Sequence, residues 1–405
     1  MNTSEMIRSE MTPVISAGWQ GDALLPVYKQ PSTVIVGGEG SYLVSAEGKR
    51  YLDFTAGIAV NALGYGDPDL AGAIRAALDT GLIHTSNLYR TLPVAELASW
   101  LVAHSFADRV FFCNSGAEAN EGAFKFARRW ARENGGADKY EIVAFRHSFH
   151  GRTFGALAAT DRPGYQEPFR PLMPGVHFVE PGDVEGFDAV VSAERTAAVI
   201  IEPIQAEGGV VPVPPEFLAH IREVCDRNGV LLIFDEVQVG LGRTGNLWGH
   251  EATGVTPDLM TLAKPIAGGL PMGAVLLTER VAAAIRPGDH ATTFGGGPLV
   301  ASAALAVCRK IGSPDFLADI RRKGDLIADV LGALALQRDE IVSVRGSGLI
   351  WGIETSTDAA PAIAAAFEAG LLLVGAGPRV IRLLPPLNIS DEDLRAGLTT
   401  IAEVL

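Results

Sequence analysis

The sequence predicts an α/β protein with a large domain on a mostly parallel sheet and a smaller α+β domain. Apolar segments rich in β-branched residues alternate with helical patterns through the middle of the chain, as in βαβ units. Continuous apolar runs such as residues 230–234 suit strands that helices cover on both faces. A chain of 405 residues is too long for one compact core, so we expect more than one domain.

The expected elements follow this division in chain order. The N-terminal segment, residues 1–60, has strand signals at 34–36, 42–44 and 51–53, and we expect it to pack with the small domain. The large domain, residues 61–310, has strand signals at 110–113, 141–145, 197–202, 230–235, 259–263 and 273–278, and helical patterns at 117–133 and 215–228. The C-terminal small domain, residues 311–405, has strand signals at 342–344, 350–353, 371–374 and 380–383, and helical patterns at 316–334, 359–369 and 391–405. Ser390 is the expected cap of the last helix.

Composition excludes several classes of protein. Apolar residues make up 48% of the chain and charged residues 20%, which is typical of a folded protein rather than a disordered one. A net charge of −14 argues against nucleic-acid and anionic-membrane partners, which need clustered cations. Residues 1–20 lack the apolar core of a signal peptide, and no apolar run is long enough to span a membrane. The three scattered cysteines favour a reducing cytoplasm.

Residues 112–121, Phe-Cys-Asn-Ser-Gly-Ala-Glu-Ala-Asn-Glu, lead from a predicted strand into a predicted helix. Ser115 and Glu118 have the spacing of a capping box, and Gly116 lets the backbone approach a ligand. The free N–H groups of the first helical turn favour an anion such as a phosphate. Taken alone, a capped helix start is more often only structural.

Asp235 and Lys264 each end an apolar strand, at the edge where open α/β sheets bind their ligands. Asp235 could ligate a metal, cap a helix or pair with a cation. A lysine at such a boundary is usually a solvated charge, but a desolvated amine with a lowered pKa can form a Schiff base. Each residue alone leaves these alternatives open.

Residues 148–153, Ser-Phe-His-Gly-Arg-Thr, put an aromatic side chain and a cation in one loop. Phe149 alone is typical of a core aromatic, and His147 with His150 lacks the further ligand of a metal site, so we predict no metal. Residues 240–245 match the dinucleotide fingerprint, but no apolar helix opens after them and we reject that interpretation. The chain has no HExxH, P-loop lysine or GxSxG motif.

Together these features are what an electron-sink cofactor such as pyridoxal phosphate requires. The helix start at Ser115 would anchor a phosphate, and Asp235 would bind a pyridinium nitrogen. Lys264 would form an imine, and Phe149 would stack on the ring. Their order along an α/β chain strengthens this interpretation.

From residue 26 to the region of Arg382, the sequence resembles the class III (subgroup II) aminotransferases of fold type I. The resemblance rests on residues 52–64 (LDFTAGIAVNALG), 112–120 (FCNSGAEAN), 149–153 (FHGRT), 201–209 (IEPIQAEGG) and 293–298 (TFGGGP). It implies a seven-stranded, mostly parallel sheet in the large domain. Within the family, these segments are most similar to the branch that acts on N2-acetylornithine.

The resemblance implies roles around the cofactor ring. Lys264 would form the internal aldimine and then carry the proton between the substrate Cα and C4′ of the cofactor. Asp235 would keep the pyridine nitrogen protonated. Gln238 would lie near the phenolic oxygen, and Phe149 would stack on the ring face.

The resemblance also implies a homodimer with shared active sites. Gly116 and Ala117 would give backbone N–H groups to the phosphate, with Ser115 beside them. Thr293 matches a residue that reaches the phosphate of the neighbouring subunit. A monomer should then be nearly inactive.

Four further residues are implied to bind substrate. Arg152 matches the arginine that grips the substrate carboxylate, and Arg382 matches the one that binds 2-oxoglutarate and glutamate. Glu207 matches a glutamate that pairs with the second arginine while the amino donor is bound. Tyr28 matches a residue near the substrate entrance.

The implied reaction is ping-pong: N2-acetylornithine gives its terminal amine to the cofactor and leaves as N-acetylglutamate 5-semialdehyde, and 2-oxoglutarate then becomes glutamate. Ala206 replaces a frequent glycine, and Lys264 precedes Pro-Ile-Ala-Gly-Gly where many members have Ala-Leu-Gly-Gly-Gly, so substrate choice stays open. The alternatives are ornithine, succinylornithine, 4-aminobutyrate or a carrier-linked aminoadipate semialdehyde as substrate, a glutamate-1-semialdehyde aminomutase, which Arg382 argues against, and a non-catalytic binding protein on this fold.

Overall fold

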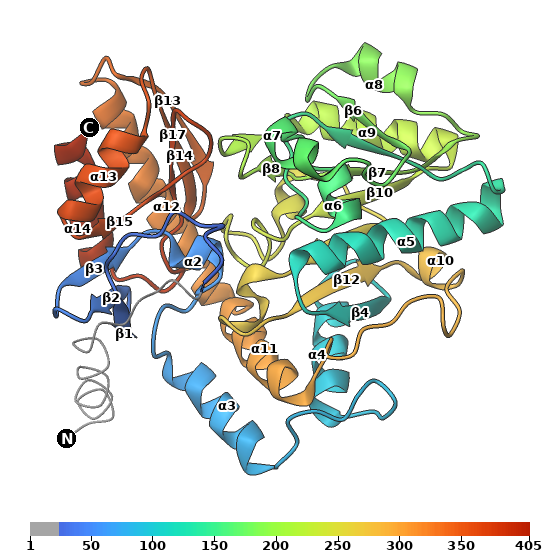
Figure 1. The fold of residues 1–405 in the computed structure, drawn as a ribbon, viewed down its shortest axis with the longest axis horizontal. Coiled ribbons are helices and arrows are strands. Elements are labelled where there is room, and N and C mark those ends of the chain that lie inside the picture. Colours follow the sequence, from blue (N-terminus) through green and yellow to red (C-terminus); the bar gives the residue numbers. More distant parts are fainter. Residues whose placement is uncertain (1–23) are drawn as a thin grey trace.

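The computed structural model describes residues 24–405, and Figure 1 shows their arrangement. The prediction that residues 1–20 are not a signal peptide lies outside these residues. In the view of Figure 1 a large α/β part lies beside a smaller part, which combines the C-terminal elements with the first strands of the chain. Within residues 24–405, no helix combines the length and the apolar character needed to cross a bilayer.

The large sheet has seven strands, as predicted. In spatial order they are β4 (Arg109–Cys113), β12 (Gly273–Leu277), β11 (Leu259–Leu262), β10 (Leu231–Asp235), β7 (Thr196–Ile201), β5 (Glu141–Phe145) and β6 (Val176–Val179). Neighbours from β11 to β6 are parallel, whereas β12 is antiparallel to both β11 and β4. The sheet is therefore mostly parallel, and it confirms the predicted fold class.

Helices cover both faces of this sheet, which explains its continuous apolar strands. Leu231 and Ile233 of β10 pack in one cluster with α5 (Gly116–Gly135). Leu232 and Phe234 pack in another with α9 (Pro215–Asn228). Successive side chains of a strand point to opposite faces, so every residue of β10 is buried.

The smaller part is built on a second sheet with the order β13 (Ile341–Ser347), β14 (Ile350–Thr355), β17 (Val380–Leu383) and β16 (Val374–Gly375). The helices of this region are α12 (Pro314–Ala335), α13 (Ala360–Glu368) and α14 (Asp391–Val404). Ser390 caps α14 as predicted, because its hydroxyl accepts a hydrogen bond of 3.0 Å from the Asp393 N–H.

The third sheet joins the two ends of the chain. It contains β1 (Ile35–Glu39), β2 (Tyr42–Ser45), β3 (Arg50–Asp53) and β15 (Leu371–Leu372), with β15 parallel to β3. The single strand predicted at 371–374 is therefore wrong, because its two halves belong to different sheets. Boundaries at residues 60 and 310 remain a prediction.

Several elements were not predicted. The strand β6 lies at the edge of the large sheet and is only partly buried, so it lacks a long apolar run. The remaining helices are α2 (Ala56–Ala59), α3 (Pro68–Asp79), α4 (Leu92–Ala103), α6 (Phe154–Ala158), α7 (Pro163–Gln166), α8 (Val184–Val190), α10 (Glu279–Ala282) and α11 (Pro298–Ile311). A hairpin of β8 (Ile204–Gln205) and β9 (Val211–Pro212) and the 3₁₀ turns η2 (Glu167–Phe169), η3 (Gly249–Thr253) and η4 (Lys264–Ala267) complete the described chain.

Candidate active site

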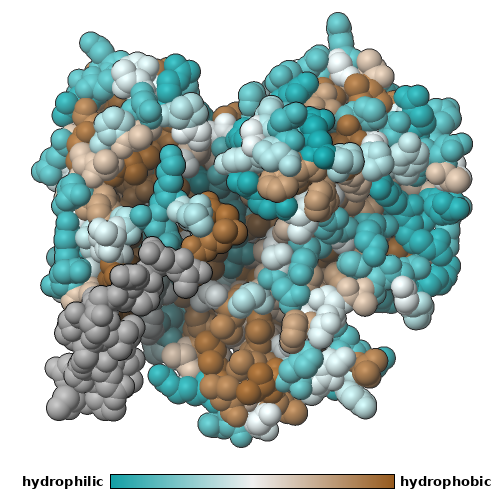
Figure 2. All heavy atoms as spheres, viewed as in Figure 1, coloured by the Kyte–Doolittle hydropathy of each residue, from teal (hydrophilic) through white to brown (hydrophobic). Residues whose placement is uncertain are grey.

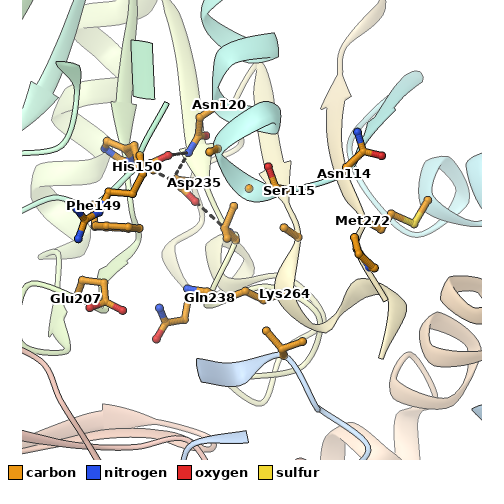
Figure 3. A pocket seen from close by; sticks show the side chains of 18 of the residues that line it. Asn114, Ser115, Asn120, Phe149, His150, Glu207, Asp235, Gln238, Lys264 and Met272 are labelled. Atoms are coloured by element: carbon orange, nitrogen blue, oxygen red, sulfur yellow. Dashed lines mark hydrogen bonds and ion pairs between the residues drawn. The ribbon is translucent and has the colours of Figure 1, made fainter. Parts of the chain in front are cut away.

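A cavity of about 390 Å³ lies where the carboxyl ends of several parallel strands meet (Figure 3). This is the edge of an open α/β sheet at which ligands bind. Figure 2 shows the surface hollowed between the two parts of the molecule. The lining residues are Val60, Asn114, Ser115, Gly116, Ala117, Asn120, Phe149, His150, Gly151, Arg152, Glu202, Glu207, Asp235, Val237, Gln238, Ala263, Lys264, Gly269, Leu270, Pro271 and Met272.

The N-terminus of α5 forms one wall of the cavity. Ser115 caps the helix, since its hydroxyl accepts from the Glu118 N–H at 3.2 Å. The predicted capping box is only half correct, because the Glu118 carboxylate accepts from the Asn114 N–H at 2.6 Å. A Cβ at Gly116 would lie 2.8 Å from a methyl carbon of Val237, so only glycine lets the helix start come this close.

Asp235 ends β10 and is held by two buried side chains that the sequence did not single out for this role. Its Oδ2 lies 2.8 Å from both Asn120 Nδ2 and His150 Nδ1, and its Oδ1 accepts from the Val237 N–H at 3.0 Å. The sequence suggests His150 only as a weak candidate metal ligand. In the structure it fixes the orientation of a carboxylate that is only 4% exposed.

Lys264 follows β11 and lines the same cavity as Asp235. Its φ of +35° lies in the left-handed region, which few non-glycine residues adopt and which is frequent at functional sites. Burial lowers the pKa of Lys264 to about 8, although the nearby charge of Glu207 opposes that shift. A lysine with this pKa is partly neutral near physiological pH and can act as a nucleophile or base.

Arg382 does not line the cavity directly but contacts two residues that do. It lies within β17, is 1% exposed, and its Nη1 donates to Glu207 at 2.7 Å and to Gln238 at 2.8 Å. Burial raises the pKa of Glu207, but the charges of Arg382 and Lys264 outweigh it, and the net pKa is lowered. Glu207 and Arg382 therefore form a buried ion pair beside the lysine.

Glu202 is a site residue that sequence reasoning missed. Its carboxylate accepts from the Phe149 N–H at 2.9 Å and from the Ala206 N–H at 3.2 Å. Burial raises the pKa of Glu202 to about 7, while the neighbouring His150 opposes the shift. The signal that could have found it is an acidic residue directly after the apolar strand β7, within the quoted segment 201–209.

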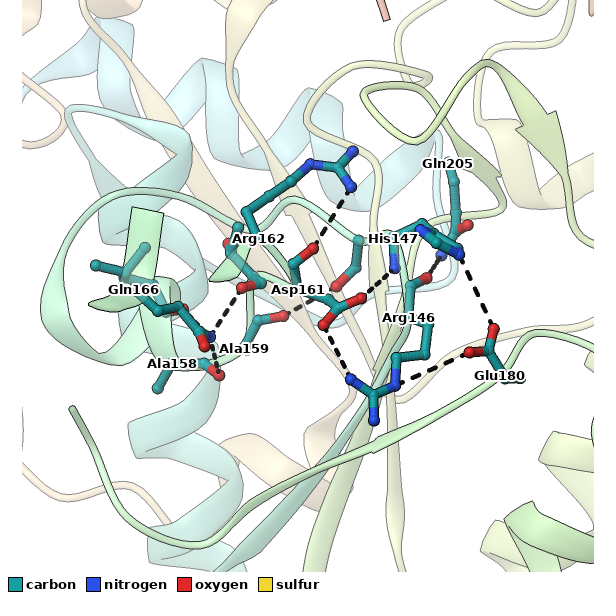
Figure 4. A network of polar contacts seen from close by, with 12 residues as sticks. Arg146, His147, Ala158, Ala159, Asp161, Arg162, Gln166, Glu180 and Gln205 are labelled. Atoms are coloured by element: carbon teal, nitrogen blue, oxygen red, sulfur yellow. Dashed lines mark hydrogen bonds and ion pairs between the residues drawn. The ribbon is translucent and has the colours of Figure 1, made fainter. Parts of the chain in front are cut away.

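The loop after β5 carries Phe149 and Arg152. Asp161 supports it, because one carboxylate oxygen accepts from the His147 N–H at 2.8 Å and the other from Arg146 at 3.2 Å (Figure 4). The Arg152 guanidinium carbon lies 3.4 Å from the ring centroid of Tyr165 and 5.9 Å from that of Phe149. Among residues 24–405, Arg152 has no ion pair or hydrogen-bond partner, so its donors stay available to a ligand.

Two predicted site residues lie away from the cavity. Thr293 is exposed on a loop beside residues 84–87, where Asn87 Nδ2 donates to the Thr292 carbonyl at 2.5 Å. Tyr28 is 78% exposed. The single chain brings together ten of the twelve predicted residues, nine on the cavity wall and Arg382 behind it, and leaves Thr293 and Tyr28 at the surface.

Comparison with known proteins places the chain in a family. The family model for class-III aminotransferases matches residues 26–405. A mitochondrial acetylornithine aminotransferase from Alnus glutinosa is 49% identical to this chain, and the match covers 95% of this chain and 86% of the relative. The crystal structure of an N-acetylornithine aminotransferase from Stenotrophomonas maltophilia has a TM-score of 0.81, 37% identity, and coverage of 93% of this chain and 96% of its own.

A second solved structure extends the likeness to the whole chain. The ornithine aminotransferase from Toxoplasma gondii has a TM-score of 0.90 at 29% identity and covers 100% of this chain and 95% of its own. The family match over residues 26–405 agrees with the structure, which has the seven-stranded sheet and places Lys264 and Asp235 at strand ends in one cavity. The chain belongs to the class-III aminotransferase family.

Proposed function

We propose that the chain is a pyridoxal-phosphate-dependent aminotransferase that transfers the terminal amine of N2-acetylornithine to 2-oxoglutarate. The products are N-acetylglutamate 5-semialdehyde and glutamate, a step of arginine biosynthesis, and the two half-reactions alternate. The observation that carries the proposal is that Lys264, Asp235 and the N-terminus of α5 line one cavity. The relatives named as acetylornithine aminotransferases support the substrate.

The residues present fit pyridoxal phosphate. Gly116 and Ala117 begin a helix of 20 residues, and their N–H groups have no acceptor among residues 24–405, which suits a phosphate. The cradle is tight, because a Cβ at Gly151 would lie 2.7 Å from the Ala117 Cβ. Asp235 carries an acceptor for a pyridinium N–H, and Phe149 offers an aromatic face on the same wall.

Asp235 and Lys264 have different roles in the proposed reaction. When bound, pyridoxal phosphate supplies a carbonyl that condenses with amines and a ring that withdraws electrons. Asp235, fixed by Asn120 and His150, would hold the ring nitrogen by accepting its hydrogen bond and would stabilise its protonated form. Lys264 Nζ, with its lowered pKa, moves a proton to and from the amine-bearing carbon of the substrate.

The Glu207–Arg382 pair lets one cavity accept two different substrates. With Glu207 in place, the guanidinium of Arg382 is neutralised and does not attract a second carboxylate. When Glu207 turns away, Arg382 can bind a carboxylate of 2-oxoglutarate with two parallel hydrogen bonds. Arg152 serves the other carboxylate, since it lines the cavity and its donors have no protein partner among the described residues.

The carboxylates of the cavity favour an amino donor whose second amine is acylated. Free ornithine carries an α-ammonium group, which would need an acidic partner. Each acidic residue on the wall is already engaged: Asp235 by Asn120 and His150, Glu207 by Arg382, and Glu202 by two backbone N–H groups. A neutral acetamide avoids this requirement.

The test is an amino-donor panel with 2-oxoglutarate as acceptor. We expect kcat/KM for N2-acetylornithine to exceed that for ornithine and 4-aminobutyrate by about tenfold or more, the size of one lost polar contact. Succinylornithine is the sharper comparison because it is acylated as well. A preference for ornithine would refute the substrate assignment. Absence of a visible absorption band that borohydride bleaches would refute the cofactor.

We also propose a homodimer in a reducing compartment such as the cytoplasm. The exposed apolar side chains Leu82, Ile83, Leu88, Tyr89, Leu92 and Phe294 support a dimer, since an apolar patch of this kind is typical of an interface. Thr293 borders this patch, which suits a residue that reaches the partner's phosphate. The three cysteines are free and buried, which suits a reducing compartment.

A further inference from the structure

A second cavity, of about 320 Å³, lies along the C-terminal half of α5. Figure 1 shows this half of the helix beside α10 and the chain that follows it. The cavity shares no lining residue with the active site. It is lined by Lys125, Phe126, Arg128, Arg129, Arg132, Ala137, Lys139, Tyr140 and Asp289.

The lining is cationic although the chain is acidic. Three arginines and two lysines meet one aspartate, Asp289, in a protein whose net charge is −14. Like charges gathered around one hollow repel each other, and the low dielectric of a cavity wall strengthens that repulsion. Such an arrangement is stabilised when an anion enters.

Asp289, the one carboxylate among the described residues that line this cavity, forms an ion pair with Arg129. Asp289 accepts from Arg129 Nε at 3.0 Å, and Arg129 Nη2 also lies 2.7 Å from Glu133. Arg129 is therefore neutralised twice within the protein. The other four cations lie beyond the ion-pair distance of every carboxylate in residues 24–405.

Two of these cations are held by backbone carbonyls, which fix position but do not neutralise charge. Arg128 donates to the carbonyls of Tyr140 and Pro174 at 2.8 and 2.9 Å. Lys139 is only 5% exposed and donates to the carbonyls of Ala193 and Asn228 at 2.7 and 3.1 Å. Burial lowers the pKa of both groups, although the nearby charge of Glu121 at Arg128 and of Glu194 at Lys139 opposes the shift.

The remaining two cations, Lys125 and Arg132, are exposed and have hydrogen-bond donors that no carboxylate of residues 24–405 occupies. Lys125 Nζ lies 2.8 Å from His290 Nδ1, a neutral partner that leaves the charge in place. Burial and the charge of Lys125 lower the pKa of His290, which keeps its ring neutral. Arg132 is exposed, and within the described chain its guanidinium has no hydrogen-bond partner.

We propose that this cavity is a second binding site, for a small molecule that carries phosphate groups with two or more negative charges. A phosphate offers several strong acceptor oxygens, and arginine forks and lysine ammoniums are its usual partners in proteins. The volume is within the range of small-ligand sites. The ring of Tyr140 borders the cations and gives such a ligand an apolar surface to rest on.

Pyrophosphate is the probe, titrated calorimetrically into the holoenzyme with 2-oxoglutarate present to occupy the active-site arginines. We expect one saturable site per chain. Arg132→Glu should raise the Kd by about tenfold or more, and Lys125→Gln by about threefold or more, as expected for lost charge-assisted hydrogen bonds. Both side chains are exposed, so both variants should fold.

The matched control is Arg395→Glu, which makes the same change of charge on an exposed position of α14. It should leave the Kd within about twofold, because surface charges further apart than a Debye length are screened. The proposal is overturned if pyrophosphate does not saturate, or if Arg395→Glu weakens binding as much as Arg132→Glu. Citrate binding as tight as pyrophosphate would overturn the phosphate class.

Discussion

Arg382 is nearly fully buried, and among residues 24–405 its charge is balanced within hydrogen-bonding distance by Glu207 alone. We predict that Arg382→Ala slows the half-reaction with 2-oxoglutarate by about 10²-fold or more, the loss of a bidentate charged contact. The half-reaction with the amino donor should slow by less than about tenfold, because Arg382 is paired with Glu207 in that half-reaction and binds no carboxylate of the donor. Single-turnover absorbance changes of the two half-reactions measure this difference. Arg379→Ala, at an exposed neighbour of β17, is the control, and equal losses in both half-reactions would contradict the role.

Lys264 also predicts how the stability of the cofactor-free chain depends on pH. Its pKa is about 8 in the fold against an ordinary 10.5, so the unfolded chain binds the proton more tightly. Stability should therefore fall as pH drops from about 10.5 to about 8, and the loss is complete below that range.

We predict that Lys264→Met stabilises the cofactor-free chain at pH 7 by on the order of 1–3 kcal/mol. The range extends down to the lower value because the lysine side chain is partly exposed to the cavity, where solvent reduces the cost of its charge. Thermal melts of both chains across this pH range measure the difference. The gain should shrink as the pH rises from about 8 and vanish above about 10.5, where the native lysine is neutral in both states. A gain that is independent of pH would show that packing, not charge, is responsible.

The sequence identified the residues that carry reactive groups but not those that orient them. Lys264 and Asp235 stand at strand ends, a position that local patterns reveal. His150 and Asn120 act through Asp235, which lies 85 and 115 residues away in the chain, so no local pattern marks them. Glu202 likewise holds the Phe149 backbone from 53 residues away.

At the scale of one element, the close packing at the start of α5 predicts that Gly116 cannot be replaced without loss of cofactor binding. A Cβ at Gly116 would lie 2.8 Å from Val237, so Gly116→Ala must push the helix start away from the strand end. We predict that pyridoxal phosphate binds this variant about tenfold more weakly or worse, because the phosphate loses aligned N–H donors. Equilibrium dialysis or the visible absorbance during cofactor titration measures this.

The matched control is Gly332→Ala in α12, where a Cβ would meet no atom within 4 Å. It should leave cofactor affinity unchanged and stabilise the chain slightly, by about 0.4–1 kcal/mol, because alanine restricts the unfolded chain and favours helix. Unchanged affinity in Gly116→Ala would show that the helix start can shift without harm.

Elements were predictable where one local pattern decides them. The buried strands of the large sheet are continuous apolar runs, and all of those predicted formed within one or two residues of their expected bounds. The short strand predicted at 371–374 failed because pairing with β3 and with β17 divides it between two sheets. The pairing of Leu371 with Leu52 joins two distant parts of the chain, and no local periodicity encodes it.

At the scale of the whole molecule, the described residues 24–405 leave an apolar surface uncovered. Figure 2 shows hydrophobic surface over the region of α3 and α11, below the central hollow. Leu88 is 83% exposed and Phe294 is 68% exposed on neighbouring loops. Burying such side chains against a second copy would recover their hydrophobic free energy, about 1.5–3 kcal/mol for each large side chain. The same contact would bring Thr293 to the partner.

Leu88→Asp should therefore shift the protein towards monomer and lower activity at the same time. The change puts a charge into each of two symmetric contacts, so we expect the dimer Kd to rise by about 10²-fold or more. Light scattering during size-exclusion chromatography measures mass, and turnover at matched concentrations measures the loss. Leu336→Asp is the control, since Leu336 is 91% exposed just after α12 and outside this surface. A dimeric, fully active Leu88→Asp variant would place the interface elsewhere, and a fully active monomer would remove any need for the partner's Thr293.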